Sequence, residues 1–351
     1  MSGTRVLIVL TPGFPANEQD STCLPAQQLF IKKFAAQHPS VTIIVLTYHY
    51  PYTNILYHWN GAMVIPFNGR NKRKADKLLL WRKVWKTLRA IRNRETIIGV
   101  LSFWCTECAL LGHYFSRRFK LVHFCWILGQ DAKKDNRFVR FIKPVPSELI
   151  AMSPFLAKTF ERNHGIRPAH IIPNGVDGAQ RINVSEERDN DILAAGSLIP
   201  LKQYDVLIRV AAELVKDFPK LKVVLVGTGP EAAQLSNLIQ VNILQQHVSM
   251  KGELAHEKVL ELMQKAKVFA HPSSYEGFST VCLEALQAGA HVVSFCEPGG
   301  EKVEQWHVVG GETEMKNKLK ELLSEDALKH ESVVPFRMEE SAGAIGKLFG
   351  L

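Results

Sequence analysis

The chain has 351 residues, 46% of them hydrophobic, and carries a formal net charge of +9 at pH 7. This length and apolar content allow a large buried core, which excludes a disordered chain and favours two domains over one. The longest apolar runs have the length of strands, and the first residues lack the apolar core of a signal peptide. We therefore expect a cytoplasmic protein with no membrane-spanning segment.

The positive charge is concentrated in the first half of the chain. Residues 1–178 contain 25 Lys and Arg against 10 Asp and Glu, a net charge of +15. Residues 179–351 contain 18 against 24, a net charge of −6. This asymmetry indicates two bodies with different partners.

Six cysteines lie in apolar surroundings, which is typical of reduced thiols in a core and not of a disulfide framework. Cys105 and Cys108 form a C-x-x-C pair, but no second pair follows at the spacing of a zinc site. The pattern does not favour a metal or redox role.

Strand-like and helix-like segments alternate along the chain, which predicts an α/β protein with parallel sheets covered by helices on both faces. In the first half, the predicted strands are 5–10, 41–48, 96–104, 120–128 and 148–153, and the predicted helices are 23–38, 74–94, 106–117 and 154–164. The polar residues 178–191 are interpreted as a linker. Beyond it, the predicted strands are 191–197, 221–227, 247–252, 267–273 and 290–295, and the predicted helices are 204–218, 230–240, 255–266, 280–289, 312–324 and 337–348.

The segment YEGFSTVCLEA, residues 275–285, places two carboxylates at the junction of a predicted strand and helix. Glu276 lies in the loop before the helix, and Glu284 lies about five residues into it. Amides at the helix start favour an anion such as a diphosphate, and Ser279 or Thr280 can cap this helix. A carboxylate suits paired ribose hydroxyls, so the segment predicts a sugar-nucleotide site. The alternative, two solvated carboxylates, fits less well with the apolar helix between them.

Several segments in this region carry a resemblance to a known family. EGFSTVCLE resembles the E-x7-E motif of retaining glycosyltransferases of the GT-B fold, family 4, also called the glycosyl transferases group 1. Other segments that resemble the family follow the same order, namely ILGQDAK (127–133), IIPNGVD (171–177), GSLIPLKQYDVLI (196–208), VVLVGTGP (223–230) and VSMKGEL (248–254). The resemblance is dense from about residue 150 to residue 296.

The resemblance implies two Rossmann-like domains that face each other across a cleft. It implies an acceptor-binding domain at 1–178, a nucleotide-sugar-binding domain at 179–335, and a C-terminal helix within 336–351 that packs back on the first domain. It also implies a metal-independent enzyme without a cofactor. Glu276 would contact the transferred sugar, Lys202 would neutralise the leaving diphosphate, and Glu284 would bind the ribose. The donor would also meet the backbone amides of Gly277, Phe278, Ser279 and Thr280.

Three positions depart from the family pattern. Ser197 stands where a phosphate-binding Arg is expected, and Gly13 is the nearest equivalent of a Gly-Gly loop that meets the donor. Leu128 stands where a His is expected, which leaves Gly129 and Asp131 of that motif. Asp131 either orients the acceptor or the sugar, or caps the segment that follows it.

Two further features have alternative interpretations. Residues 227–232, GTGPEA, fit a dinucleotide fingerprint, but the acidic residue expected at the end of the next strand is absent. Residues 70–94 contain eleven Lys or Arg against a single acidic residue, Asp76. The stripe of Leu78, Trp81, Trp85 and Leu88 is predicted to pack inward, while the cationic face could attract an anionic membrane or a phosphorylated acceptor. No motif indicates nucleic acid binding.

Together these observations predict a retaining hexosyltransferase that uses a UDP- or GDP-sugar donor and a glycan or lipid-linked glycan acceptor. The expected setting is bacterial cell-surface polysaccharide or glycolipid synthesis, in the cytoplasm or peripherally on the inner membrane face. The alternative motivated by Ser197 and Leu128 is a non-catalytic nucleotide-sugar-binding module. A dinucleotide-dependent oxidoreductase is less favoured.

Overall fold

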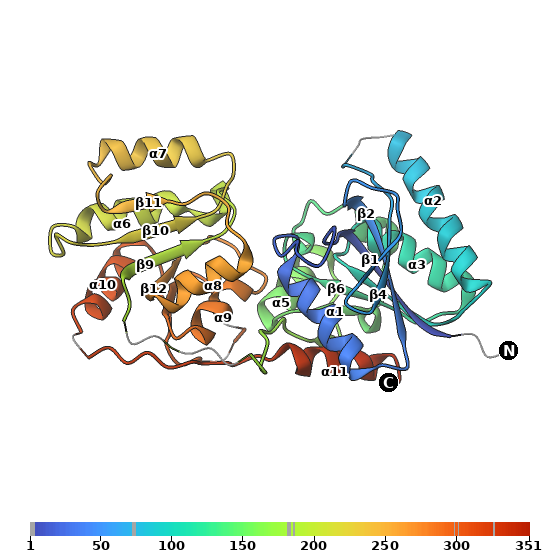
Figure 1. Ribbon diagram of the computed structural model, residues 1–351. Helices are drawn as coiled ribbons and strands as arrows, with labels where there is room; N and C mark the ends of the chain where they lie inside the picture. Colours follow the sequence, from blue (N-terminus) through green and yellow to red (C-terminus); the bar gives the residue numbers. More distant parts are fainter. Residues whose placement is uncertain are drawn as a thin grey trace. The chain divides into compact units, whose positions relative to one another are not determined.

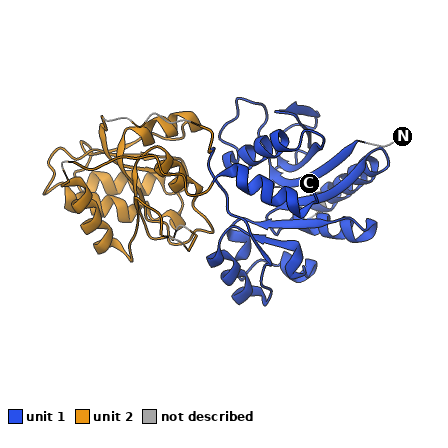
Figure 2. Cartoon of the chain, turned by 90° about the horizontal axis from the view of Figure 1, so that it is seen from below, with its two compact units in different colours: residues 1–177, 337–351 blue, residues 178–336 orange. Residues whose placement is uncertain are grey.

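The computed structural model describes residues 4–71, 75–180, 184, 187–297, 299–300, 302–325 and 327–351. The chain divides into two compact units (Figure 2). The first unit comprises residues 1–177 and 337–351, and the second comprises residues 178–336. Parts of the predicted linker (181–183 and 185–186) and of the basic segment (72–74) lie outside the described residues.

An eight-stranded sheet forms the centre of the first unit, in the order β3-β4-β2-β1-β5-β6-β7-β8 (Figure 1). The strands are β1 (Arg5–Gly13), β2 (Thr42–Tyr50), β3 (Tyr57–Trp59), β4 (Ala62–Pro66), β5 (Thr96–Phe103), β6 (His123–Ile127), β7 (Leu149–Ala151) and β8 (His170–Ile171). Neighbouring strands pair in parallel except β3 and β4, which are antiparallel. The central strands are buried and apolar because helices cover the sheet.

The helices of the first unit are α1 (Pro25–Gln37), α2 (Ala75–Arg92), α3 (Glu107–Phe119), α4 (Phe138–Ile142), α5 (Pro154–His164) and α11 (Met338–Leu348). Two single turns of 3-10 helix, η1 (Gln130–Ala132) and η2 (Pro146–Glu148), precede and follow α4 in the chain. Leu10 and Leu46 of the sheet share one apolar cluster with Val84 of α2 and Phe115 of α3. This cluster fixes α2 and α3 on one face of the sheet.

The last helix, α11, packs on α1 and so belongs to the first unit. Lys33 of α1 forms ion pairs with Asp177 at 2.6 Å and with Glu339 at 2.8 Å. A side chain at Gly346 would overlap the His38 ring as it lies here, so the two helices approach closely at this point. The end of the chain thereby completes a layer of the first unit.

A six-stranded parallel sheet forms the second unit, in the order β11-β10-β9-β12-β13-β14. The strands are β9 (Asn190–Ala195), β10 (Val223–Val226), β11 (Val248–Met250), β12 (Ala266–His271), β13 (His291–Ser294) and β14 (Trp306–Val308). The helices are α6 (Tyr204–Leu214), α7 (Ala232–Val241), α8 (His256–Gln264), α9 (Thr280–Gln287) and α10 (Glu312–Leu323), with the single turn η3 (Pro200–Lys202). One apolar cluster joins the sheet to α6, α7 and α10.

The apolar stripe predicted for the basic helix is partly wrong. Leu78 is 60% exposed, and the buried stripe of α2 consists of Leu80, Val84, Leu88 and Ile91. These residues follow a spacing of three to four, so the helix turns this face and not Leu78 toward the sheet. Trp81 and Trp85 lie at the edge of the stripe, partly buried.

No helix in the described ranges combines the length and the apolar character needed to cross a bilayer.

Candidate functional site

The predicted donor residues lie at the carboxyl edge of the second sheet, where the strand order changes direction. β9 and β12 are hydrogen-bonded neighbours at the centre of the sheet, although two strands separate them in sequence. The loop after β9 leads into η3, and the loop after β12 leads into α9. Ligands of open α/β sheets bind at such a point. The two loops are therefore placed to form one site.

Close approach of two loops positions the segment that follows β9. Gly196 and Gly227 both have positive φ, 150° and 141°. A side chain at Gly227 would overlap the carbonyl oxygen of Gly196, and one at Gly229 would overlap that of Leu198. The glycines of GTGPEA therefore allow the loop after β10 to contact the loop after β9.

Lys202 and Glu276 lie together in this site. The Lys202 ammonium donates a hydrogen bond to Glu276 Oε1, and both side chains are 17% exposed. His271, the last residue of β12, lies with Nε2 at 3.1 Å from the same oxygen. The site thus joins one carboxylate, one ammonium and one imidazole from three chain segments.

The surroundings keep Glu276 ionised. Burial alone would raise its pKa, but the hydrogen bond from His271 and the charge of Lys202 outweigh burial and lower the pKa to about 2. Burial lowers the pKa of His271 despite the nearby carboxylate. A neutral His271 imidazole that donates from Nε2 to Glu276 is consistent with the lowered pKa of both residues.

The start of α9 lies next to this cluster. Ser279 is the N-cap residue, but its side chain does not cap the helix as predicted. Its hydroxyl instead donates to Cys282 Sγ at 3.1 Å and lies 3.4 Å from His271 Nε2. Phe278 is 8% exposed and packs edge-on against Phe336, with ring centroids 5.3 Å apart. This packing holds the loop of Gly277–Thr280 against the helix start, where backbone amides and the helix dipole favour an anion.

Glu284 is positioned by a histidine of the neighbouring helix. His256 Nε2, at the start of α8, lies 2.9 Å from Glu284 Oε1. Burial alone would lower the pKa of His256, but the hydrogen bond to Glu284 outweighs it and raises the pKa. The contact restrains the carboxylate predicted to bind ribose.

The remaining predicted residues differ in their surroundings. Ser197 is exposed in the loop after β9. Gly13 ends β1 in the first unit, where its carbonyl accepts a hydrogen bond from Thr11 at 2.8 Å.

Asp131 is a buried residue of the first unit. One carboxylate oxygen accepts from Cys105 N at 2.8 Å and the other from Gly129 N at 2.8 Å and Leu128 N at 3.1 Å. Burial raises its pKa to about 6, although these amides favour the ionised form. All three amides come before Asp131 in the sequence, so the contacts join the loops after β5 and β6, and acceptor orientation and capping of the following segment both stay predictions.

Sequence reasoning missed His271 and His256 as site residues. The signal that could have found His271 is a polar residue at the carboxyl end of a buried strand, but nothing in the sequence indicates which helix His256 contacts. Within the part of the chain that the structure describes, no three His, Cys, Asp or Glu side chains are grouped to hold a metal ion. Metal independence stays a prediction.

The family resemblance is confirmed for the second unit. Residues 177–330 match the family described as Glycosyl transferases group 1. The gpi3 subunit of phosphatidylinositol N-acetylglucosaminyltransferase from Schizosaccharomyces pombe is 34% identical over 93 residues, which are 26% of this chain and 20% of the relative. The D-inositol 3-phosphate glycosyltransferase of Kineococcus radiotolerans is 30% identical over 154 residues, 37% of this chain and 35% of the relative. The chain thus spans about a third or less of the length of these two curated relatives.

Solved structures match nearly the whole chain. Sucrose-phosphate synthase from Thermosynechococcus elongatus superposes with a TM-score of 0.75 at 18% identity, and the match covers 99% of this chain and 98% of the other. The Anabaena protein HepE in complex with UDP-glucose gives a TM-score of 0.68 at 18% identity, with 98% and 94% covered. The predicted fold class, a GT-B fold of two Rossmann-like domains, is confirmed.

Proposed function

We propose that the protein is a glycosyltransferase that moves a hexosyl group from a UDP- or GDP-sugar to an acceptor hydroxyl with retention of configuration. The observation that carries this proposal is the pairing of Lys202 with Glu276 beside the start of α9. The structures of HepE with UDP-glucose and of the pneumococcal O-GlcNAc transferase GtfA with UDP and GlcNAc support it, since both proteins share the fold of this chain.

In the proposed step, the bond between the anomeric carbon and the diphosphate oxygen breaks while a bond to the acceptor oxygen forms on the same face. The acceptor proton passes to the leaving diphosphate, so no separate protein base takes part. Lys202 and the amides at the start of α9 stabilise the charge that builds up on the diphosphate. Neither a metal ion nor a cofactor is part of the proposal.

The other site residues hold the donor in this proposal. Glu284, restrained by His256, accepts hydrogen bonds from the ribose hydroxyls, and Glu276 accepts from the hydroxyls of the sugar. Gly277, Phe278, Ser279 and Thr280 contribute their amides, while Ser197 and Gly13 contact the donor only through short or absent side chains. Lys202 then acts without the arginine that the family pattern places at position 197.

The proposed acceptor is an anionic glycan or lipid-linked glycan bound by the first unit. The charge of +15 over residues 1–178 favours such an acceptor. The two curated relatives are named for phosphatidylinositol and for D-inositol 3-phosphate. Both names are consistent with an acceptor that bears phosphate. The setting we propose is glycolipid or surface polysaccharide synthesis in the cytoplasm of a bacterium, at the inner face of the membrane.

The proposal is tested by nucleotide release from UDP- and GDP-sugars, with and without phosphorylated acceptors. We expect Glu276→Ala to lower turnover with little change in nucleotide affinity. Glu284→Ala should weaken nucleotide binding by roughly tenfold, the effect of losing one charged hydrogen-bonded contact. Glu253→Ala, at an exposed position of a nearby loop, serves as the matched control.

The second candidate is a nucleotide-sugar-binding module without catalysis, and the exposed Ser197 in place of a cation favours it. Tight nucleotide binding without turnover on any donor and acceptor pair would support this module and refute the transferase.

A further inference from the structure

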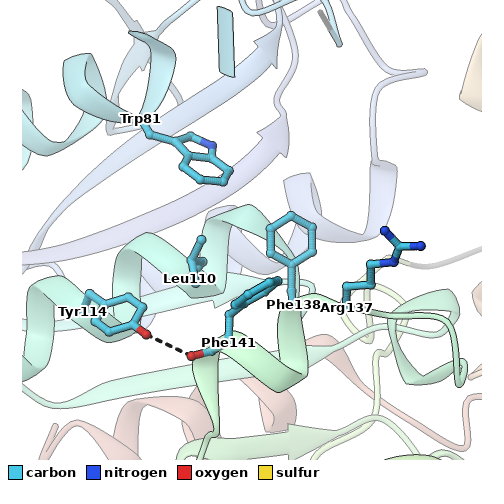
Figure 3. Close-up of a pocket in the computed structure, with 6 residues that line it drawn as sticks. All are labelled: Trp81, Leu110, Tyr114, Arg137, Phe138 and Phe141. Atoms are coloured by element: carbon cyan, nitrogen blue, oxygen red, sulfur yellow. Dashed lines mark hydrogen bonds between the residues drawn. The ribbon is translucent and has the colours of Figure 1, made fainter. Parts of the chain in front are cut away.

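An apolar pocket opens in the first unit between α2, α3 and α4. Its volume is about 460 Å³, within the range that binds small-molecule ligands. The lining residues are Trp81, Leu110, Tyr114, Arg137, Phe138 and Phe141. Figure 3 shows Trp81 of α2 facing the side chains that α3 and α4 contribute, with Arg137 at one side. None of these six residues takes part in the donor site described above.

Side-chain hydrogen bonds hold together the three helices that line the pocket. Trp81 Nε1 donates to Glu107 Oε2 at 2.8 Å, which ties α2 to the first turn of α3. The Tyr114 hydroxyl donates to the Phe141 carbonyl at 2.9 Å, which ties α3 to α4 (Figure 3). Phe141 nevertheless stays 64% exposed. Together with Tyr114, which is 49% exposed, it leaves adjoining aromatic surface open to solvent at this pocket, and contiguous apolar surface of this kind marks a site that binds a partner.

The pocket adjoins the carboxyl ends of β5 and β6, the edge where an open α/β sheet binds its ligand. α3 follows β5 after three residues, and Leu110 lies in its first turn. Asn136 donates to the carbonyls of Cys105 and Asp131, at 2.8 and 2.7 Å, directly before Arg137. A ligand headgroup at this edge would therefore lie beside the pocket.

Charge around the pocket favours an anionic ligand. The exposed Arg137 lines it, Arg140 lies one turn further along α4, and α4 contains no acidic residue. Lys77 lies near the Trp81 side, 3.6 Å from Glu107. The combination of an apolar interior and a cationic rim matches a hydrocarbon chain that ends in a phosphate.

We propose that this pocket binds the hydrocarbon chain of a lipid-phosphate acceptor, with Arg137 beside its phosphate. This inference rests on the proposed transferase function and specifies the acceptor. The chain occupies the space between Trp81, Leu110 and Phe138, and Phe141 covers it from outside. The phosphate and the hydroxyl to be glycosylated lie toward the carboxyl edge of the sheet.

The test uses the full chain and dodecyl phosphate below its micelle concentration, with binding measured by calorimetry. We expect saturable binding of one molecule per chain. Phe141→Asp should weaken binding by at least roughly tenfold. The substitution removes an aromatic contact and adds a negative charge that repels the phosphate of the ligand. The matched control is Phe155→Asp on α5, where the phenylalanine is 46% exposed but does not line the pocket. That control should bind as the wild type does.

The headgroup contact is tested separately. Arg137→Gln should reduce the preference for dodecyl phosphate over dodecyl maltoside, whereas Lys158→Gln, at an exposed position of α5 that does not line the pocket, should leave it unchanged. Equal losses in both variants would indicate general electrostatic attraction and overturn the assignment of Arg137.

Other outcomes separate this inference from the transferase proposal. Binding to anionic vesicles without binding of monomeric dodecyl phosphate would make this face a membrane-contact surface and overturn the pocket. Nucleotide release with a water-soluble acceptor, together with no dodecyl phosphate binding, would refute the pocket alone. Dodecyl phosphate binding without nucleotide release from any donor would support the pocket and refute the transferase.

Discussion

Lys202 donates a hydrogen bond to the carboxylate of Glu276, although 74 positions separate the two residues in sequence. The pair forms because β9 and β12 are neighbours, so the loops that follow them meet at one edge of the sheet. Each residue neutralises the other before a donor binds. A bound diphosphate would offer the ammonium a second anionic partner, which connects donor binding to the release of the Glu276 carboxylate toward the sugar.

The low pKa of Glu276 predicts a specific loss of stability in acid. The folded-state pKa of about 2 lies below the ordinary value of 4.5, so the folded state binds fewer protons than the unfolded state in that interval. The stabilisation is present above pH 4.5 and is lost as the pH falls toward 2, by up to about 3 kcal/mol. We expect Glu276→Gln to be less stable than the wild type at pH 7, with a clearly smaller difference at pH 2.5. Denaturant unfolding at both values measures this, and an equal difference at both would contradict the ion pair.

His256 predicts a stability change in the opposite direction. Its pKa is raised in the folded state, so its contribution is full below pH 6.5 and is lost as the pH rises through the folded-state pKa. Replacing it by glutamine should remove this dependence between pH 6 and 8, while a neutral hydrogen bond to Glu284 is kept. Unfolding curves across that range, with His58→Gln at an exposed position as control, are the measurement. A pH dependence unchanged in His256→Gln would rule out the charged contact.

The two interpretations of Asp131 predict different results for Asp131→Ala. Loss of the carboxylate leaves the buried amides of Cys105, Leu128 and Gly129 without this acceptor, so the free energy of unfolding should fall by about 3 kcal/mol. Asp135→Ala, at an exposed position in the same segment, should change it little. A variant of unchanged stability that turns over acceptor slowly would instead favour a role in acceptor orientation.

The loop after β10 approaches the loop after β9 closely at Gly227 and Gly196, so the effect of an alanine substitution on stability should depend on which glycine is replaced. Gly227 and Gly252 both have positive φ, 141° and 68°, but only at Gly227 would a methyl group overlap another backbone atom, the carbonyl oxygen of Gly196. Gly252→Ala should therefore cost about 1 kcal/mol, and Gly227→Ala clearly more. Because Gly196 precedes Lys202, the second variant should also weaken nucleotide binding. Thermal unfolding and nucleotide titration of both variants test this, and equal effects would show that the close approach is unimportant.

Much of the fold follows from sequence periodicity, because long buried strands and amphipathic helices repeat clear patterns. The helix predicted at 154–164 is observed as α5 with the same bounds. The short elements β3, β4, α4 and β14 were not predicted, since three to five residues carry too little periodicity. The wrong stripe on α2 has a similar cause, because apolar residues occur on more than one side of this helix.

The candidate site was only partly predictable for a different reason. Motif spacing indicated Glu276, Glu284 and Lys202, but not that Lys202 would contact Glu276. The contact of His271 with Glu276 depends on how the loop after β12 folds back, and the contact of His256 with Glu284 joins segments that are distant in sequence. Such contacts follow from strand order and helix packing, and a motif does not encode them.

The return of the chain at α11 makes the second unit an insertion within the first. Met338 N donates to the Val176 carbonyl at 2.9 Å, so the chain leaves and re-enters the first unit at adjacent points. A short artificial connection from residue 177 to residue 337 would therefore close the first unit without residues 178–336. The two units could then be expressed as separate polypeptides, each with a continuous backbone of its own.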